Sequence, residues 1–154
     1  MKKLIGVAAV FVCMLFSGCT VAQYTFLRNL TQHTVEVYFD FDITSMKSIP
    51  DSIYVPYSAV SHSVNKKAIT YMTDSIVAKR YTGTTLRISL PTGSMIMLDK
   101  KTSHKIGYNY PERMKVAVPG KEPYTVRLSG ALQAGEKQFQ QKGNSPKMYW
   151  HDIY

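Results

Sequence analysis

The alternation of apolar and polar side chains is the feature that most restricts how this chain folds. Apolar residues occupy every second position of two short segments, 35–40 and 86–90. In an extended strand, successive side chains point to opposite faces, so a segment of this kind buries one face and exposes the other. The period of two therefore predicts strands with one face on a hydrophobic core.

Similar short segments recur along the chain. They are rich in Tyr, Val, Ile and Thr, and turn residues separate them. Pro91-Thr92-Gly93-Ser94 predicts a hairpin turn between 86–90 and a return strand over 95–98. Further strands are expected over residues 24–28, 35–40, 52–55, 114–118, 124–128 and 148–154, with 59–64 resuming the strand that Pro56 interrupts.

Two segments are harder to assign. In residues 68–79, the apolar residues Ile69, Met72 and Ile76 would share one face of a helix. The β-branched content and a Thr-Asp-Ser turn signal in the same segment favour two short strands instead. We expect strands there, with the helix as the alternative. Residues 131–147 are polar and are expected to form a loop.

The number and spacing of these segments set the expected fold class. Seven to nine short strands separated by turns, with no convincing crossover helix between them, predict an all-β domain. The specific expectation is an antiparallel β-sandwich of the immunoglobulin-like or transthyretin-like kind.

The first nineteen residues differ in texture from the rest of the chain. Lys2 and Lys3 form a positive start, thirteen apolar residues run over 4–16, and small residues follow. A helix that spans a bilayer needs about 20 apolar residues, so this run is too short to be one. The layout predicts a secretory signal peptide.

The end of this signal, Phe16-Ser17-Gly18-Cys19, resembles the lipobox of bacterial lipoproteins. The resemblance implies cleavage before Cys19 and acyl chains such as palmitate on that cysteine, which hold the protein on a membrane. The chain then divides into a signal peptide over 1–18, a lipidated cysteine with a short tether over 19–23, and a single domain over 24–154. A cut after Ala22 is the alternative, and it would release a soluble exported chain.

The same resemblance implies a location in the cell envelope. Thr20 is not the aspartate that favours inner-membrane retention in some lipoproteins, and no acidic run of the type linked to surface export follows Cys19. The expected location is the outer membrane, facing the periplasm.

Cysteine usage narrows the chemistry of the exported chain. Cys13 lies in the signal peptide, which leaves Cys19 as the one cysteine after cleavage. Lipid on that sulfur removes disulfides, thiolate catalysis and cysteine-metal sites together. An exported domain of this kind is held together by its core and its backbone pairing.

The processed chain is basic. Removal of residues 1–18 lowers the formal net charge from +9 to +7. This excess favours anionic partners such as lipid headgroups, lipopolysaccharide or cell-wall polymers, and export argues against nucleic acid; the alternative is that the charge serves solubility alone. The candidate contacts for an anion or glycan are Lys100, Lys101, Lys105, Tyr108, Tyr110, Arg113 and Lys115.

No motif in the sequence predicts catalysis. The histidines at 33, 62, 104 and 151 lack zinc-ligand spacing, and no nucleophile elbow, Walker loop or dinucleotide fingerprint occurs. We therefore expect no metal, no cofactor and no enzyme. The tripeptides Asp51-Ser52-Ile53 and Asp74-Ser75-Ile76 resemble an O-glycosylation motif of exported proteins in one group of Gram-negative bacteria, which implies sugar on Ser52 and Ser75.

These expectations define three hypotheses for function. The leading hypothesis is a membrane-anchored, non-enzymatic accessory protein that binds another envelope protein or supports an assembly. The alternative is a binding module for an anionic glycan or lipid. A hydrolase with a site built from scattered residues ranks last.

Overall fold

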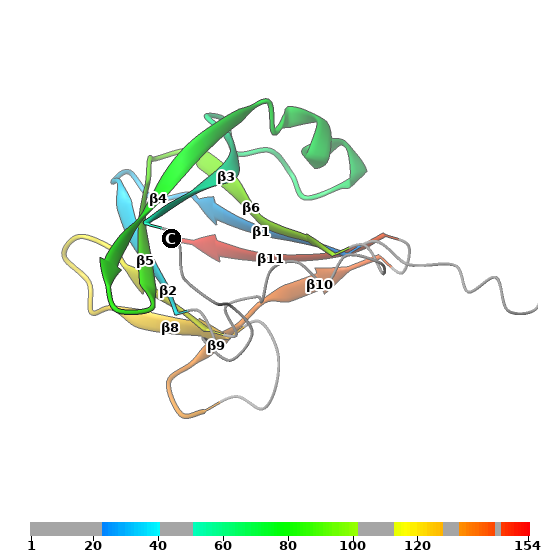
Figure 1. Ribbon diagram of the computed structural model, residues 1–154. Coiled ribbons are helices and arrows are strands. Elements are labelled where there is room, and N and C mark those ends of the chain that lie inside the picture. The colour runs from blue at the N-terminus through cyan, green and yellow to red at the C-terminus, as the bar shows by residue number, and fades with distance from the viewer. Residues whose placement is uncertain (1–22, 41–50, 102–112, 128–132, 144–145) are drawn as a thin grey trace, which may run out of the picture.

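The computed structural model describes residues 23–40, 51–101, 113–127, 133–143 and 146–154. Within them, the chain forms eleven strands and one short 3-10 helix, η2 (Figure 1). In chain order these elements are β1 (Gln23–Asn29), β2 (Val35–Asp40), β3 (Ser52–Ser58), η2 (Lys66–Tyr71), β4 (Asp74–Thr82), β5 (Thr85–Leu90), β6 (Ser94–Lys101), β7 (Arg113–Ala117), β8 (Tyr124–Arg127), β9 (Lys137–Gln138), β10 (Gln140–Lys142) and β11 (Lys147–Ile153).

These strands belong to one sheet, which curls until it is nearly closed into a barrel (Figure 1). The order across the sheet is β10-β11-β1-β6-β3-β4-β5-β2-β7-β8-β9. Most neighbours are antiparallel, but β1 runs parallel to β11, and β8 runs parallel to β9. The prediction of an all-β domain is confirmed. The prediction of a two-sheet antiparallel sandwich is wrong, because hydrogen-bonded neighbours link the described strands into a single mixed sheet.

The chain itself joins the two ends of this sheet. β9 pairs with β8 at one end, and β10 pairs with β11 at the other. A single residue, Phe139, separates β9 from β10, and its side chain is buried in the main core. Part of the segment 131–147, expected to be a loop, therefore forms a strand that changes partner at Phe139 and brings the two ends together.

The main core fills the interior of the curled sheet. β2 and β5 follow the predicted alternation: Val37 and Ile88 are buried, whereas Arg87 and Ser89 are exposed. The apolar side chains thus point inward and the polar ones outward. The buried residues of this core are Leu27, Val35, Val37, Phe39, Val55, Ala78, Leu86, Ile88, Leu90, Ile96, Met114, Val116, Val118, Val126, Phe139 and Ile153.

β5 and β6 do not form the predicted hairpin, although the turn between them has the expected sequence. β3 and β4 lie between them in the sheet. The side-chain amide of buried Asn29 donates to the carbonyls of His33, Leu90 and Pro91 at 2.7, 2.8 and 3.0 Å. These bonds tie the turn after β1 to the turn after β5, so tertiary contacts determine the path of this turn and local hairpin chemistry does not.

One part of the sheet is covered on its outer face as well. The segment 64–72, which includes η2, packs over the outward side chains of β1, β6 and β11 (Figure 1). β1 is buried on both faces as a result, which accounts for four consecutive buried residues over 24–27. This second core consists of Tyr24, Phe26, Val64, Ala68, Met95 and Met148, with Ile69, Met72, Met97 and Trp150 packed against it.

The ambiguous segment 68–79 contains both of the predicted alternatives. η2 ends at Tyr71, and β4 begins at Asp74. Residues 59–64 form no strand, so β3 does not resume after Ser58. η2 has six residues, and no helix in the described part of the chain is long and apolar enough to cross a membrane.

Candidate functional site

The structure separates the residues that the sequence predicted as one cationic site. Lys105, Tyr108 and Tyr110 lie outside the described residues, as do the side chains of Lys100 and Lys101. Lys100 and Lys101 end β6, and four strands of the sheet separate β6 from β7. Of the predicted set, Arg113 and Lys115 are described, and both are exposed on β7.

Lys115 belongs instead to a cross-strand row on the outer face of the sheet. Lys79 on β4 pairs with Arg87 on β5, Arg87 pairs with Tyr38 on β2, and Tyr38 pairs with Lys115 on β7. Residues opposite one another in neighbouring strands lie on the same face, about 5 Å apart. The row therefore places three cations and an aromatic ring side by side across four strands.

A second tyrosine widens this row. The ring of Tyr81, which is 54% exposed, meets the ring of Tyr38 edge-on at 5.1 Å between centroids. The Arg87 guanidinium carbon lies 5.7 Å from the Tyr81 centroid, within cation–π range. We call Tyr38, Lys79, Tyr81, Arg87 and Lys115 the basic face.

Among the described side chains, Glu36 is the carboxylate that pairs with a member of the basic face. Glu36 lies 3.5 Å from Nε of Arg87 and accepts a hydrogen bond from the Ser89 hydroxyl at 2.6 Å. Among the described residues, no carboxylate forms an ion pair with Lys79 or Lys115. An excess of positive charge beside exposed aromatic rings is an arrangement that attracts anions.

The other charged clusters serve the fold. Arg127 and Glu136 form an ion pair with Nε–Oε2 at 2.6 Å, with both side chains less than a tenth exposed. Glu136 also accepts from the Gln133 backbone and lies 3.6 Å from Nε of Arg113. The hydrogen bond from Arg127, helped by the Gln133 bond, lowers the pKa of Glu136. This cluster attaches the segment before β9 to the end of β8.

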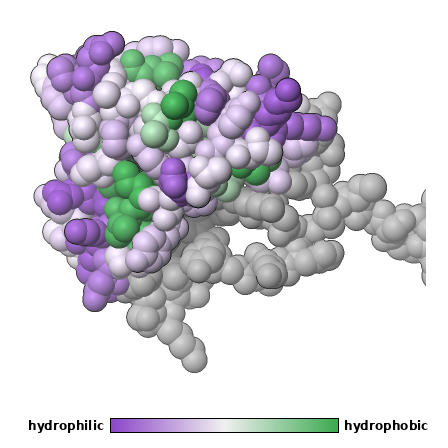
Figure 2. All heavy atoms as spheres, turned by 90° about the horizontal axis from the view of Figure 1, so that it is seen from above, coloured by the Kyte–Doolittle hydropathy of each residue, from purple (hydrophilic) through white to green (hydrophobic). Residues whose placement is uncertain are grey.

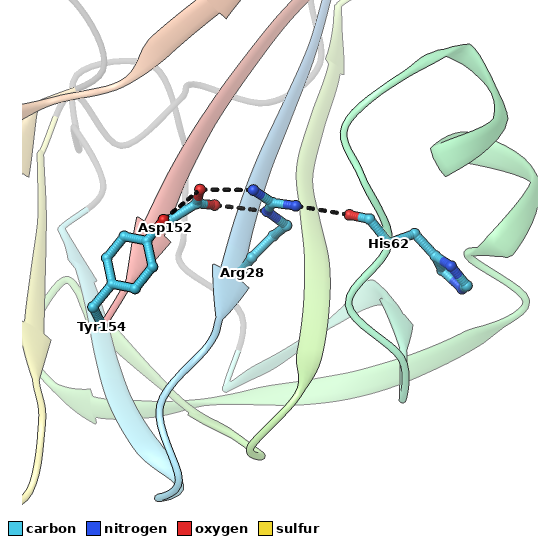
Figure 3. A network of polar contacts seen from close by, with 4 residues as sticks. All are labelled: Arg28, His62, Asp152 and Tyr154. Carbon is cyan, nitrogen blue, oxygen red and sulfur yellow. Dashed lines mark hydrogen bonds and ion pairs between the residues drawn. The ribbon is translucent and has the colours of Figure 1, made fainter.

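A second cluster fastens the segment over the second core (Figure 3). The guanidinium of Arg28 donates twice to the Asp152 carboxylate, with both bonds at 2.6 Å, and once to the carbonyl of His62 at 3.0 Å. Tyr154 donates to the same carboxylate at 3.3 Å. Figure 3 shows Arg28 between Asp152 of β11 on one side and His62, in the segment between β3 and η2, on the other. The bidentate geometry holds β1 to β11 and the covering segment to both.

The third cluster lies at the seam, the junction of β8 and β11 formed by Tyr124, Phe139 and His151. Tyr124 Oη lies 3.2 Å from Nε2 of His151, and Phe139 packs against the imidazole. Burial, reinforced by the charge of Lys137, lowers the pKa of His151 to about 4. Burial also raises the pKa of Tyr124 to about 12. Both groups are therefore neutral at pH 7.

The contact between Tyr124 and His151 joins two neutral groups at the seam. The tautomer of the imidazole sets which of the two groups donates. The pair closes the seam with side chains, where the described strands β8 and β11 form no ladder with each other.

The remaining predicted sites are placed as follows. Ser52 and Ser75 are both exposed, at the starts of neighbouring strands β3 and β4. The register puts Ser75 opposite Pro56, so the two serines lie on one outer face about 13 Å apart along the strand. His104 lies outside the described residues, and within them no three histidine, cysteine or acidic residues gather as metal ligands.

No broad apolar docking surface is visible on the face seen from above, where apolar side chains form small separate areas among polar ones (Figure 2). The basic face is therefore the candidate functional site. No protein-family model, curated protein or solved structure matches this chain.

Proposed function

We propose that this protein is a lipid-anchored envelope lipoprotein whose domain binds an anionic glycan polymer on the basic face without catalysing a reaction. The observation that carries the proposal is the row of Lys79, Arg87, Tyr38 and Lys115 across four strands. Three cations in one row match an anion repeated along a polymer better than they match a single small ligand.

The chemistry of each member supports this ligand class. The planar Arg87 guanidinium can donate two parallel hydrogen bonds to a carboxylate or phosphate, whereas Lys79 and Lys115 act as point charges. The exposed ring of Tyr81 offers an apolar surface to the face of a sugar ring. The row crosses four neighbouring strands, so an extended chain can lie along it.

The basic face favours this reading over a protein-binding accessory module. Cores of protein interfaces are depleted in charged residues, and lysine above all is under-represented in them. An anionic polymer is held by many weak charge contacts, and that suits a face with two lysines and one arginine.

The anchor supports the proposal from the sequence side. Acyl chains on Cys19 would hold the domain on the outer membrane, among anionic envelope polymers. A Cys19→Ala variant tests the anchor: it should lose palmitate labelling and leave the membrane fraction. Equal labelling of both proteins would show that Cys19 is not the acylated residue.

The binding test uses the processed chain and an acidic polysaccharide, titrated at rising salt. We expect the affinity to fall as salt rises, because a shorter Debye length screens exposed charges. Lys79→Gln with Lys115→Gln should weaken binding about tenfold or more, if each lysine contributes about 1 kcal/mol near a dense anionic surface. Tyr81→Ala should weaken binding to the polysaccharide but should change binding to polyphosphate, which has no sugar ring, much less.

Lys142→Gln is the matched control, because Lys142 is an exposed lysine on β10 and lies outside the basic face. It should bind as the unchanged protein does. A loss in the control as large as that of Lys79→Gln or Lys115→Gln alone would mean that net charge alone drives binding. Salt-independent binding, or capture of a neutral protein partner by the same face, would overturn the proposal.

A further inference from the structure

The length of the tether determines which end of the sheet lies at the membrane. Three residues, and so four Cα–Cα steps, separate Cys19 from Gln23, the first residue of β1. A fully extended chain gains at most about 3.6 Å per residue, so Gln23 is held within about 14 Å of the acylated cysteine. The start of β1 is therefore the part of the domain nearest to the lipid surface.

Lysines gather at this end of the sheet. Gln23 pairs with Lys147 at the start of β11 and with Lys101 at the end of β6. Lys142, the last residue of β10, pairs with Met148, the second residue of β11. The end of β6, the end of β10 and the start of β11 therefore each carry a lysine beside the start of β1.

η2 adds two more lysines beside them. Ala68 of η2 belongs to the second core together with Tyr24 and Met148, which are the second residues of β1 and β11. Lys66 and Lys67 precede Ala68 on the same short helix and are exposed. The hydrogen bond from Arg28 to the carbonyl of His62 fastens the segment that leads into this helix. Lys66 and Lys67 are thus two exposed cations on a segment that packs, through Ala68, on the same second core as the starts of β1 and β11.

We propose that this end, defined by Lys66, Lys67, Lys142 and Lys147, docks on anionic lipid headgroups of the membrane that carries the anchor. The proposal rests on the lipid anchor of the proposed function. Charge complementarity and the short tether select the membrane as the partner, because lysines near an anionic surface are attracted to it within a Debye length. Asp74, which begins β4 just after η2, is the described carboxylate closest to η2 in the sequence.

This docking would fix the orientation of the domain. The opposite end carries the turn after β7, where Lys121 donates to the carbonyl of Tyr154. Tyr154 follows Met148 by six positions, a distance of about 20 Å along an extended chain. Glu122, in the same turn as Lys121 and exposed, would then be the far reference point. The basic face lies on other strands and would remain open to a polymer.

The test measures the distance of each end from the headgroups in the lipidated, processed protein. Because Cys13 is removed and Cys19 is acylated, a single cysteine at Gln141 or at Glu122 is the one thiol that accepts a spin label. The protein is inserted in vesicles of phosphatidylethanolamine and phosphatidylglycerol that contain a trace of lipid with a nickel-chelating headgroup. Relaxation of each spin label by the nickel is then compared with that in phosphatidylcholine vesicles.

We expect strong relaxation at Gln141 and weak relaxation at Glu122 in the anionic vesicles. High salt, or phosphatidylcholine alone, should reduce this difference to the smaller one that the short tether imposes without charge. Equal relaxation of the two labels in anionic vesicles would overturn the proposed orientation while leaving the anchor intact. A chain that does not float with vesicles at all would disprove the anchor, and the docked orientation with it.

Charge reversal separates this surface from the basic face. Lys142→Glu with Lys147→Glu should lower the difference between the two labels to its value in phosphatidylcholine vesicles but leave polysaccharide binding unchanged. Lys79→Glu should do the reverse. If Lys79→Glu removed the difference between the labels as fully as the double variant, the membrane contact would be a general effect of net charge and the proposal would fail.

Discussion

The second core and the basic face both occupy the outer side of one sheet, yet the first is covered and the second is open. Phe26 on β1 and Tyr38 on β2 both point outward, but Phe26 is fully buried under the segment 64–72, whereas Tyr38 is half-buried beside exposed lysines. The covered wall, made of β1, β6 and β11, has apolar residues on both faces. The open wall, made of β4, β5, β2 and β7, alternates apolar inward and polar outward residues. The outward side chains are therefore shielded from solvent in the covered wall and partly accessible to solvent in the open wall.

Truncating the outward aromatic residue of each wall tests this comparison most strongly. Phe26→Ala should lower the free energy of unfolding by about 3–5 kcal/mol, because it leaves a cavity in the second core. Tyr38→Ala should cost about 1 kcal/mol, from the lost edge-on contact with Tyr81. Denaturant unfolding midpoints at equal slope measure both values. Similar losses for the two variants would mean that the open wall is as important for stability as the covered one.

Breaking the ion pair of the covered wall should lower the free energy of unfolding more than breaking that of the open wall. Asp152→Ala leaves the mostly buried Arg28 guanidinium without its partner and should cost on the order of 3 kcal/mol. Arg87→Ala breaks an exposed pair and should cost about 0–1 kcal/mol. A double-mutant cycle with Arg28→Met and Asp152→Leu separates the pair energy from the cost of a stranded charge. A large cost for Arg87→Ala would contradict the assignment of that residue to binding.

Low pH should lower the contribution of the seam to the free energy of unfolding. The pKa of His151 is about 4 in the folded protein, against 6.5 as the ordinary value, so the unfolded chain binds the extra proton between these limits. This contribution is fully present above pH 6.5, is lost as pH falls towards 4, and amounts to about 3 kcal/mol at 1.36 kcal/mol per pKa unit.

A His151→Phe variant isolates this effect. The difference in unfolding free energy between the variant and the unchanged protein should change with pH across this window and level off above and below it. Unfolding measured by urea at a series of pH values gives the comparison. A constant difference would show that the ring is not held neutral in the folded state.

The smallest effects are expected for the lysines of the basic face. Lys79→Gln and Lys115→Gln should each change the free energy of unfolding by no more than about 0.5 kcal/mol, as is usual for exposed substitutions. Thermal unfolding of the single variants measures this. A loss of stability comparable to that of Asp152→Ala would place these lysines in the fold rather than in a binding surface.

The sequence predicted the elements better than their arrangement. The alternation at 35–40 and 86–90 predicted both strand and buried face, because that information is local. Strand order is not local: Asn29 redirects the turn at Pro91 through bonds to residues more than sixty positions away. The short polar strands β9 and β10 were not predicted from the sequence. The one buried apolar residue of this segment is Phe139, which lies between them, and their pairing comes from β8 and β11.

The candidate site was predictable in kind but not in place. Tyr38 and Arg87 were readable as outward residues of alternating strands. Their meeting with Lys79 and Lys115 depends on the order β4-β5-β2-β7, which joins strands from three separate parts of the chain. The prediction relied on closeness in sequence over 100–115, whereas the described cations converge across strands.

The parallel pairing of β1 with β11 has a consequence for the order of folding. Arg28 and Asp152, which it brings together, are 124 positions apart in the chain. β1 cannot gain its second neighbour until the final residues have been synthesised, and sheets with such distant partners fold slowly, on a scale of milliseconds to seconds. For a chain exported as we propose, the seven-residue strand β11 therefore decides when the pairing of β1 is complete.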